Sequence, residues 1–81
     1  MPRLVKLDDV WRMLDECLHG HQRIQKPHRW NVTHGGRTYH EVPLGDHGRR
    51  KNPDIETGHV RGLVKFFRIP RECYEKFVDL H

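Results

Sequence analysis

The sequence predicts an α+β domain in which helices cover one face of a three-stranded antiparallel sheet, in the order α-β-β-β-α. Three observations support this: a stripe of apolar residues with helical spacing, an alternating segment around a Gly-Gly pair, and a second helical stripe near the C-terminus. A chain of 81 residues buries only roughly 60% of its unfolded surface, so this core is about the largest it can build. We therefore expect a single domain over residues 1–81.

The first predicted helix begins near Leu7 and ends near Gly20. Its apolar residues recur every three or four positions and form one stripe: Leu7, Val10, Trp11, Leu14, Cys17 and Leu18. Asp8 and Asp9 lie in the first turn, where acidic side chains interact favourably with the helix dipole. Gly20 can adopt the left-handed conformation that commonly ends a helix.

Three strands are expected in the middle of the chain: Gln22–Lys26, Arg29–Thr33 and Arg37–Val42. Pro27 follows the first of them, which indicates a short strand at the edge of the sheet. Gly35-Gly36 separates the other two and predicts a hairpin. Tyr39 and Val42 have opposite strand parity although both suit the buried face, so either a β-bulge lies between them or the predicted register is wrong.

The segment from Pro43 to Thr57 is polar and is predicted to be a long loop, which carries the basic run Arg49-Arg50-Lys51. A second amphipathic helix is expected from about Gly58 to Arg68, with Val60, Leu63, Val64 and Phe67 as its apolar stripe. Pro70 ends that pattern and suits the first turn of a short further helix. Two helices can cover only one face of the sheet, so we expect the other face to be exposed.

The bulk composition points to a cytoplasmic protein with an anionic partner. The formal net charge of +4 suits a nucleic acid or an acidic protein. The N-terminus lacks the apolar run of a signal peptide, and no segment is long and apolar enough to span a bilayer. Cys17 and Cys73 fall on the apolar faces of predicted helices, so they are interpreted as two buried thiols and not as a disulfide framework.

Two stretches of the chain carry a resemblance to a known family. The first is Lys26-Pro27-His28-Arg29-Trp30, followed by the turn at Gly35-Gly36 and by Val42-Pro43. The second runs from Ile55 to Tyr74, where a glycine opens a helix and paired aliphatic residues, a lysine, Ile69-Pro70 and a short acid-aromatic turn follow. With the order of helices and strands, they make residues 7–77 similar to the HicA family of bacterial toxin ribonucleases. His59 stands where that family has threonine.

The resemblance implies a double-stranded-RNA-binding-like fold and a toxin that cleaves mRNA endonucleolytically without a metal or another cofactor. It also implies a HicB-type antitoxin protein as partner and a catalytic role for His28. A histidine suits this role because it can accept or donate a proton near neutral pH. Strand parity places His28 in phase with Trp30 and Val32, toward the helices, so catalysis requires it to lie at the rim of that face.

Four cationic residues are candidates for binding the RNA phosphates. Lys26 and Arg29 flank His28 in the sequence. Arg61 and Lys65 are four residues apart on the second predicted helix, which places them on one side of it. Trp30 and Tyr39 could stack on bases, although core packing is the preferred interpretation of Trp30.

Two alternatives to a nuclease remain open at the level of sequence. The same fold could hold RNA or a protein without cutting. A zinc-stabilised interaction domain could instead use Cys17, His19, His21 and Cys73, although the chain has no CxxC or HxxxH pair.

Overall fold

The computed structural model describes residues 3–43 and 53–80, so the predicted basic run Arg49-Arg50-Lys51 lies outside the described residues. The elements in chain order are β1 (Leu4–Lys6), α1 (Leu7–Cys17), β2 (Gln22–Gln25), β3 (Arg29–His34), β4 (Arg37–Pro43), β5 (Asp54–Glu56), α2 (Thr57–Phe66) and α3 (Arg71–Tyr74). Within the described ranges, none of the helices has the length and apolar character required to cross a bilayer.

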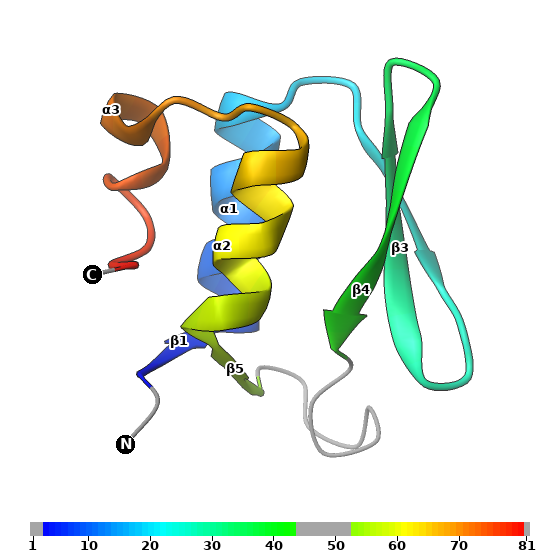
Figure 1. Ribbon diagram of the computed structural model, residues 1–81, viewed down its shortest axis with the longest axis horizontal. Helices are drawn as coiled ribbons and strands as arrows, with labels where there is room; N and C mark the ends of the chain where they lie inside the picture. The colour runs from blue at the N-terminus through cyan, green and yellow to red at the C-terminus, as the bar shows by residue number, and fades with distance from the viewer. Residues whose placement is uncertain (1–2, 44–52, 81) are drawn as a thin grey trace.

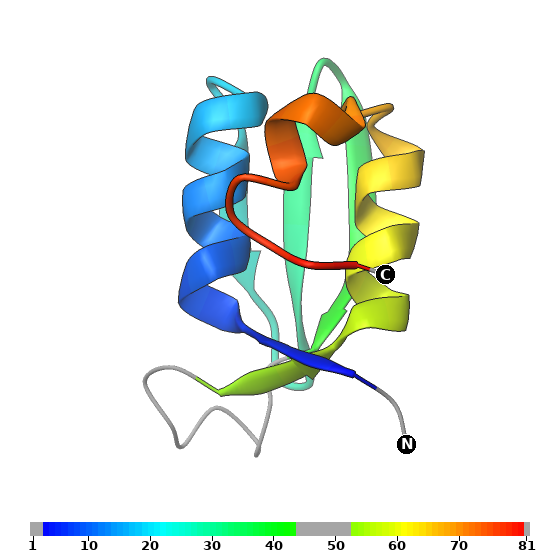
Figure 2. The same cartoon turned by 90° about the vertical axis from the view of Figure 1, so that its left-hand side faces the viewer.

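The elements form three layers (Figure 1). Strands β2, β3 and β4 make an antiparallel sheet in that order, and α1 and α2 lie side by side against one of its faces. The third layer is α3, which lies on the other side of the helix pair (Figures 1 and 2). The predicted three-stranded sheet with helices on one face is therefore confirmed. The core lies between these layers, with Val10, Met13, Leu14, Val32, Ile55 and Leu63 as its largest fully buried side chains.

The sheet contains the β-bulge that the parity of Tyr39 and Val42 suggested. Trp30 pairs with Val42 and Val32 pairs with Tyr39, so the single residue Asn31 faces two residues of β4. The hairpin turn between β3 and β4 is also as predicted. Gly35 and Gly36 have φ angles of 59° and 78°, a left-handed conformation at both positions that suits a tight hairpin.

A two-stranded antiparallel ribbon of β1 and β5 was not predicted, because each strand has only three residues and shows too little alternation to be detected. The end of the predicted polar loop is therefore a strand. Each strand of the ribbon runs directly into a helix. The amide of Leu7, the first residue of α1, donates to the carbonyl of Pro53 at 2.9 Å. The amide of Thr57, the first residue of α2, donates to the carbonyl of Arg3 at 3.0 Å. The ribbon thus holds the N-termini of both helices together.

Left-handed residues follow both long helices. After α1 the residue is Gly20, at a φ of 82°, as predicted. After α2 it is Arg68, at a φ of 55°. The amide of Arg68 donates to the carbonyl of Lys65, and the amide of Ile69 donates to that of Val64, the pattern of a Schellman motif. Glycine is the usual residue at the position that Arg68 occupies.

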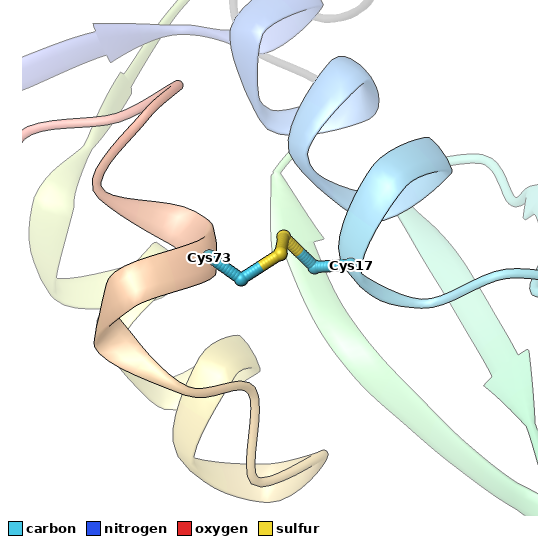
Figure 3. Close-up of a disulfide and its surroundings, with 2 residues drawn as sticks. All are labelled: Cys17 and Cys73. Atoms are coloured by element: carbon cyan, nitrogen blue, oxygen red, sulfur yellow. A yellow bond between two sulfur atoms is a disulfide. The ribbon is translucent and has the colours of Figure 1, made fainter.

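A disulfide joins α1 to α3, so the interpretation of Cys17 and Cys73 as two buried thiols is wrong (Figure 3). Their Cα atoms are 5.9 Å apart although the residues are 56 positions apart in the sequence. Sequence spacing could not predict this pairing, because it depends on how α3 folds back over the helix pair. The four residues of α3 are too few to form a stable helix alone, so packing and this cross-link hold it in place.

We expect reduction of the disulfide to lower the free energy of unfolding by about 2–4 kcal/mol, because it constrains a long loop of the unfolded chain. Urea unfolding with and without dithiothreitol measures this difference. The double variant Cys17→Ala/Cys73→Ala is the control, and its stability should not respond to dithiothreitol. Equal stability of the oxidised and fully reduced wild-type chains would contradict the expectation.

Candidate functional site

His28 lies in the connection between β2 and β3, immediately before the first residue of β3. The amide of Lys26 donates to the carbonyl of Arg29 at 2.7 Å and closes this turn. The side chain of His28 is exposed, and it lines a hollow with His59 of α2, which agrees with the expected position at the rim of the face that the helices cover. The turn places the imidazole at the end of the sheet, where a ligand can reach it.

His28 lines a shallow hollow on the surface together with Arg29, His40, Glu41, Pro43 and His59. His40 and Glu41 come from β4, and His59 comes from the first turn of α2. The hollow therefore gathers side chains from the turn before β3, from β4 and from a helix that follows much later in the chain. Among the described residues, three imidazoles, one guanidinium and one carboxylate line it.

The β-bulge explains how β4 contributes to the hollow. Tyr39 and Val42 pack against the core, and the two residues between them are exposed. In a regular strand one of these two residues would face the core and the other would face solvent. The bulge leaves both His40 and Glu41 on the surface.

A close approach between β4 and α2 brings His59 to the hollow. The hydroxyl of Tyr39 donates to the carbonyl of His59 at 3.4 Å, and the Tyr39 ring packs on Phe66 with 5.4 Å between the ring centroids. Gly62 permits this contact, because a Cβ atom there would lie 2.5 Å from the Tyr39 hydroxyl oxygen. Sequence reasoning missed His40 and His59 as site residues. The predicted bulge and the replacement of the family threonine by His59 were the only signals that could have found them.

The four predicted RNA-binding residues do not form one cluster. Arg29 lines the hollow with His28, whereas the exposed Lys26 lies next to it in sequence and does not line it. Arg61 and Lys65 lie on one side of α2, as predicted, and line a different depression between α2 and α3. The structure thus places Arg29 and the pair Arg61 and Lys65 on two separate surfaces.

The aromatic candidates pack against the helices. Trp30 is half-buried and meets Trp11 of α1 edge to face, with 5.3 Å between the ring centroids. Core packing, the preferred interpretation of Trp30, is confirmed. Tyr39 is half-buried between β4 and α2, where its ring and its hydroxyl both contact the helix.

The zinc hypothesis is wrong for the disulfide-bonded protein, because the sulfur atoms of Cys17 and Cys73 are bonded to each other. His21 has other partners: its Nδ1 donates to the carbonyl of Leu18 at 3.0 Å, and its Nε2 accepts a hydrogen bond from Nε of Arg23 at 3.1 Å. In residues 3–43 and 53–80 no group of three or more potential ligand side chains could hold a metal ion.

Comparisons with protein-family models, with curated proteins and with solved structures find no match to this chain. The functional assignment therefore depends on the residues themselves and on how the fold arranges them.

We expect Gly62→Ala to destabilise the protein by about 1–3 kcal/mol, because the added methyl group overlaps the Tyr39 hydroxyl. In a Tyr39→Phe background the nearest ring carbon would lie 3.5 Å from the methyl group, an ordinary contact. Alanine should then stabilise the helix by about 0.5–1 kcal/mol relative to glycine. Urea unfolding of the four variants measures the coupling, and additive effects would contradict the close approach.

We expect His21 to make the fold less stable as the pH falls. Burial lowers the pKa of His21 below its usual value of 6.5, and Arg23 acts in the same direction, whereas the Leu18 carbonyl and Asp15 oppose them. The unfolded chain therefore binds more protons than the folded chain once the pH falls through 6.5, and the free energy of unfolding decreases. Unfolding measured from pH 7.5 to 5.5 should show a shallower dependence in His21→Gln than in the wild type.

His19→Gln is the matched control, because His19 is an exposed neighbour of His21. The dependence due to His21 should persist in that variant. If His21→Gln and the wild type lost stability equally over this pH range, the assignment to His21 would be wrong.

Proposed function

We propose that this protein is a small metal-independent endoribonuclease that cleaves mRNA, with His28 as the catalytic proton-transfer residue. The observation that carries the proposal is the gathering of three histidines and Arg29 around one exposed hollow. The resemblance of residues 7–77 to HicA toxins supports the same conclusion.

The side chains of the hollow suit cleavage by the neighbouring 2′-hydroxyl of RNA. In this reaction the 2′-oxygen bonds to phosphorus, the bond from phosphorus to the 5′-oxygen breaks, and a cyclic phosphate forms. One imidazole takes the proton of the 2′-hydroxyl, and an imidazolium gives a proton to the departing 5′-oxygen. A histidine can serve in either role near neutral pH. With His40 and His59 beside it, His28 has candidate partners for the second proton transfer.

Arg29 is suited to bind the phosphate group that the 2′-oxygen attacks. Its guanidinium can donate two parallel hydrogen bonds to phosphate oxygens, and it keeps its charge throughout the reaction. Donors that meet the developing negative charge stabilise the transition state of phosphoryl transfer. Arg29 lines the hollow next to His28, so a phosphate held there would lie beside the imidazole.

In cellular terms we propose the toxin of a toxin-antitoxin pair, acting in the cytoplasm and neutralised by a HicB-type antitoxin protein. Disulfides are rarely maintained in the cytosol, so Cys17 and Cys73 would be at least partly reduced there. The double-stranded-RNA-binding-like fold belongs to the same proposal and is supported by the one-sided sheet.

A second candidate function is an RNA-binding or protein-interaction module that does not cleave. Arg61 and Lys65 favour it, because they line a surface that contains no histidine among its described residues. A strand of RNA bound only there would meet no side chain suited to proton transfer at neutral pH.

The test is cleavage of an unstructured RNA by the purified protein in the presence of EDTA. We expect the wild type to produce new RNA ends and His28→Ala to be about 10²–10⁴-fold slower, because general acid-base catalysis contributes this much. His40→Ala and His59→Ala test whether a second imidazole takes part. Each should slow cleavage if it supplies the partner proton transfer.

His19→Ala is the control, because His19 is exposed and does not line the hollow. It should cleave at the wild-type rate, and all variants should keep the far-ultraviolet circular dichroism of the wild type. If His28→Ala cleaved as fast as His19→Ala, the catalytic assignment would fail. Salt-sensitive RNA binding without new ends would favour the second candidate function.

A further inference from the structure

A basic depression lies where the C-terminal part of α2 meets the start of α3, which lies on the side of the helix pair away from the sheet (Figure 2). Four cationic side chains line it, those of Arg61, Lys65, Arg68 and Arg71, and none of the described residues that line it is acidic. We call it the α2–α3 groove. Of the described residues that line the groove, none also lines the hollow of His28.

We infer that the α2–α3 groove binds the phosphodiester backbone of single-stranded RNA and so holds a strand apart from the His28 hollow. This inference depends on the proposed function for the identity of the polyanion. It adds a binding surface, two residues that sequence reasoning did not select, Arg68 and Arg71, and a reason for the backbone conformation of Arg68.

The charges of the groove follow α2 and its C-terminal end. Arg61 and Lys65 are four residues apart, about 6 Å along the helix axis, and Arg68 comes just after the last residue of the helix and lines the same groove. A phosphodiester strand carries one negative charge per nucleotide, so a row of cations can neutralise successive phosphates. Phosphate neutralisation of this kind requires no base recognition.

These side chains are available to a ligand. Neither Lys65 nor Arg68 forms a side-chain hydrogen bond or ion pair with another residue in the described part of the chain. Nε of Arg61 donates to the carbonyl of Leu80 at 2.8 Å, which orients the guanidinium. Arg71 pairs with Glu75 at 3.2 Å, so the inference depends on the other three cations.

The charge of the groove and the ring of Tyr74 favour single-stranded RNA as the ligand. Val64 and Ile69 lie under the cations, and each is only 7% exposed. Tyr74 is half-buried and also lines the groove, and an aromatic ring can stack on a base of single-stranded RNA while the cations hold its phosphates. Recognition dominated by charge is the normal mode for a nucleic acid backbone.

Arg68 supplies an independent observation. It occupies the left-handed position of the Schellman motif after α2, with a φ of 55°. A side chain with a Cβ atom is disfavoured in this conformation, and glycine would adopt it without that penalty. A residue held in a disfavoured backbone conformation is a reason to look for a function. Here the function is to place a guanidinium at the end of the cationic row.

The test uses a fluorescein-labelled 2′-O-methyl oligouridylate of 12 nucleotides, which cannot be cut because its 2′-oxygens are blocked. Fluorescence anisotropy measures the Kd from 25 to 200 mM NaCl. The triple variant Arg61→Gln/Lys65→Gln/Arg68→Gly should bind at least about tenfold more weakly at 50 mM NaCl. Its slope of log K against log salt should be smaller by about 2, because each lost phosphate contact removes about 0.7.

The single variant Arg68→Gly separates function from stability. It should bind the oligonucleotide about threefold more weakly and raise the Tm by roughly 4 °C, because glycine relieves the left-handed strain. Arg12→Gln is the control, since Arg12 is an exposed arginine of α1 outside the groove. The Kd of Arg12→Gln should stay within about twofold of the wild-type Kd. Its salt slope should change by less than half as much as the slope of the triple variant.

An unchanged Kd and salt slope in the triple variant would overturn the inference. A 12-residue polyglutamate that binds as tightly as the oligonucleotide, and loses affinity in the triple variant, would assign the groove to an acidic protein segment instead. The proposed nuclease is tested separately: a wild type that binds through the groove but cuts no RNA keeps this inference and loses that function. If the wild type cuts RNA and the triple variant binds the oligonucleotide normally, the nuclease is kept and the groove inference is lost.

Discussion

The pairing of β1 with β5 is the constraint on which the arrangement of the helices depends. Its two strands lead straight into α1 and α2, and the amides of Leu7 and Thr57 donate to carbonyls across the ribbon. Segments that are some 50 residues apart in the sequence are thereby fixed side by side at the point where both helices begin. Since His59 lies in the first turn of α2, the ribbon also sets where that imidazole can lie.

Two local departures from regular structure then shape the surface on which we base the proposed nuclease. The turn before β3 places His28 at the surface, and the β-bulge leaves His40 and Glu41 exposed together. Gly62 lets α2 approach β4 closely enough for His59 to join them. Each departure involves one or two residues, yet together they gather three of the described histidines. Regular strands and a side chain at position 62 would disperse them.

The cationic residues lie on two separate surfaces. In the proposed nuclease one surface would serve cleavage and the other would bind the RNA backbone. One guanidinium, that of Arg29, lies in the hollow, whereas a row of cations lies between α2 and α3. A chemical site needs few charges placed accurately, and backbone binding needs several charges placed in sequence. The placement of α3 creates the second surface, so the disulfide and the packing that hold α3 also shape the groove.

The sequence by itself determined the elements whose signals are local. Periodicity predicted the two long helices, Gly35-Gly36 predicted the hairpin, and the parity of Tyr39 and Val42 suggested the bulge. Only the tertiary structure decided the β1–β5 ribbon, the Cys17–Cys73 bond and which side chains share the hollow with His28. Each of these joins segments far apart in the chain, and their meeting depends on packing that no single stretch of residues encodes. For the same reason the sequence selected His28 but not His40 or His59, and it could not show that Arg29 lies on a different surface from Arg61 and Lys65.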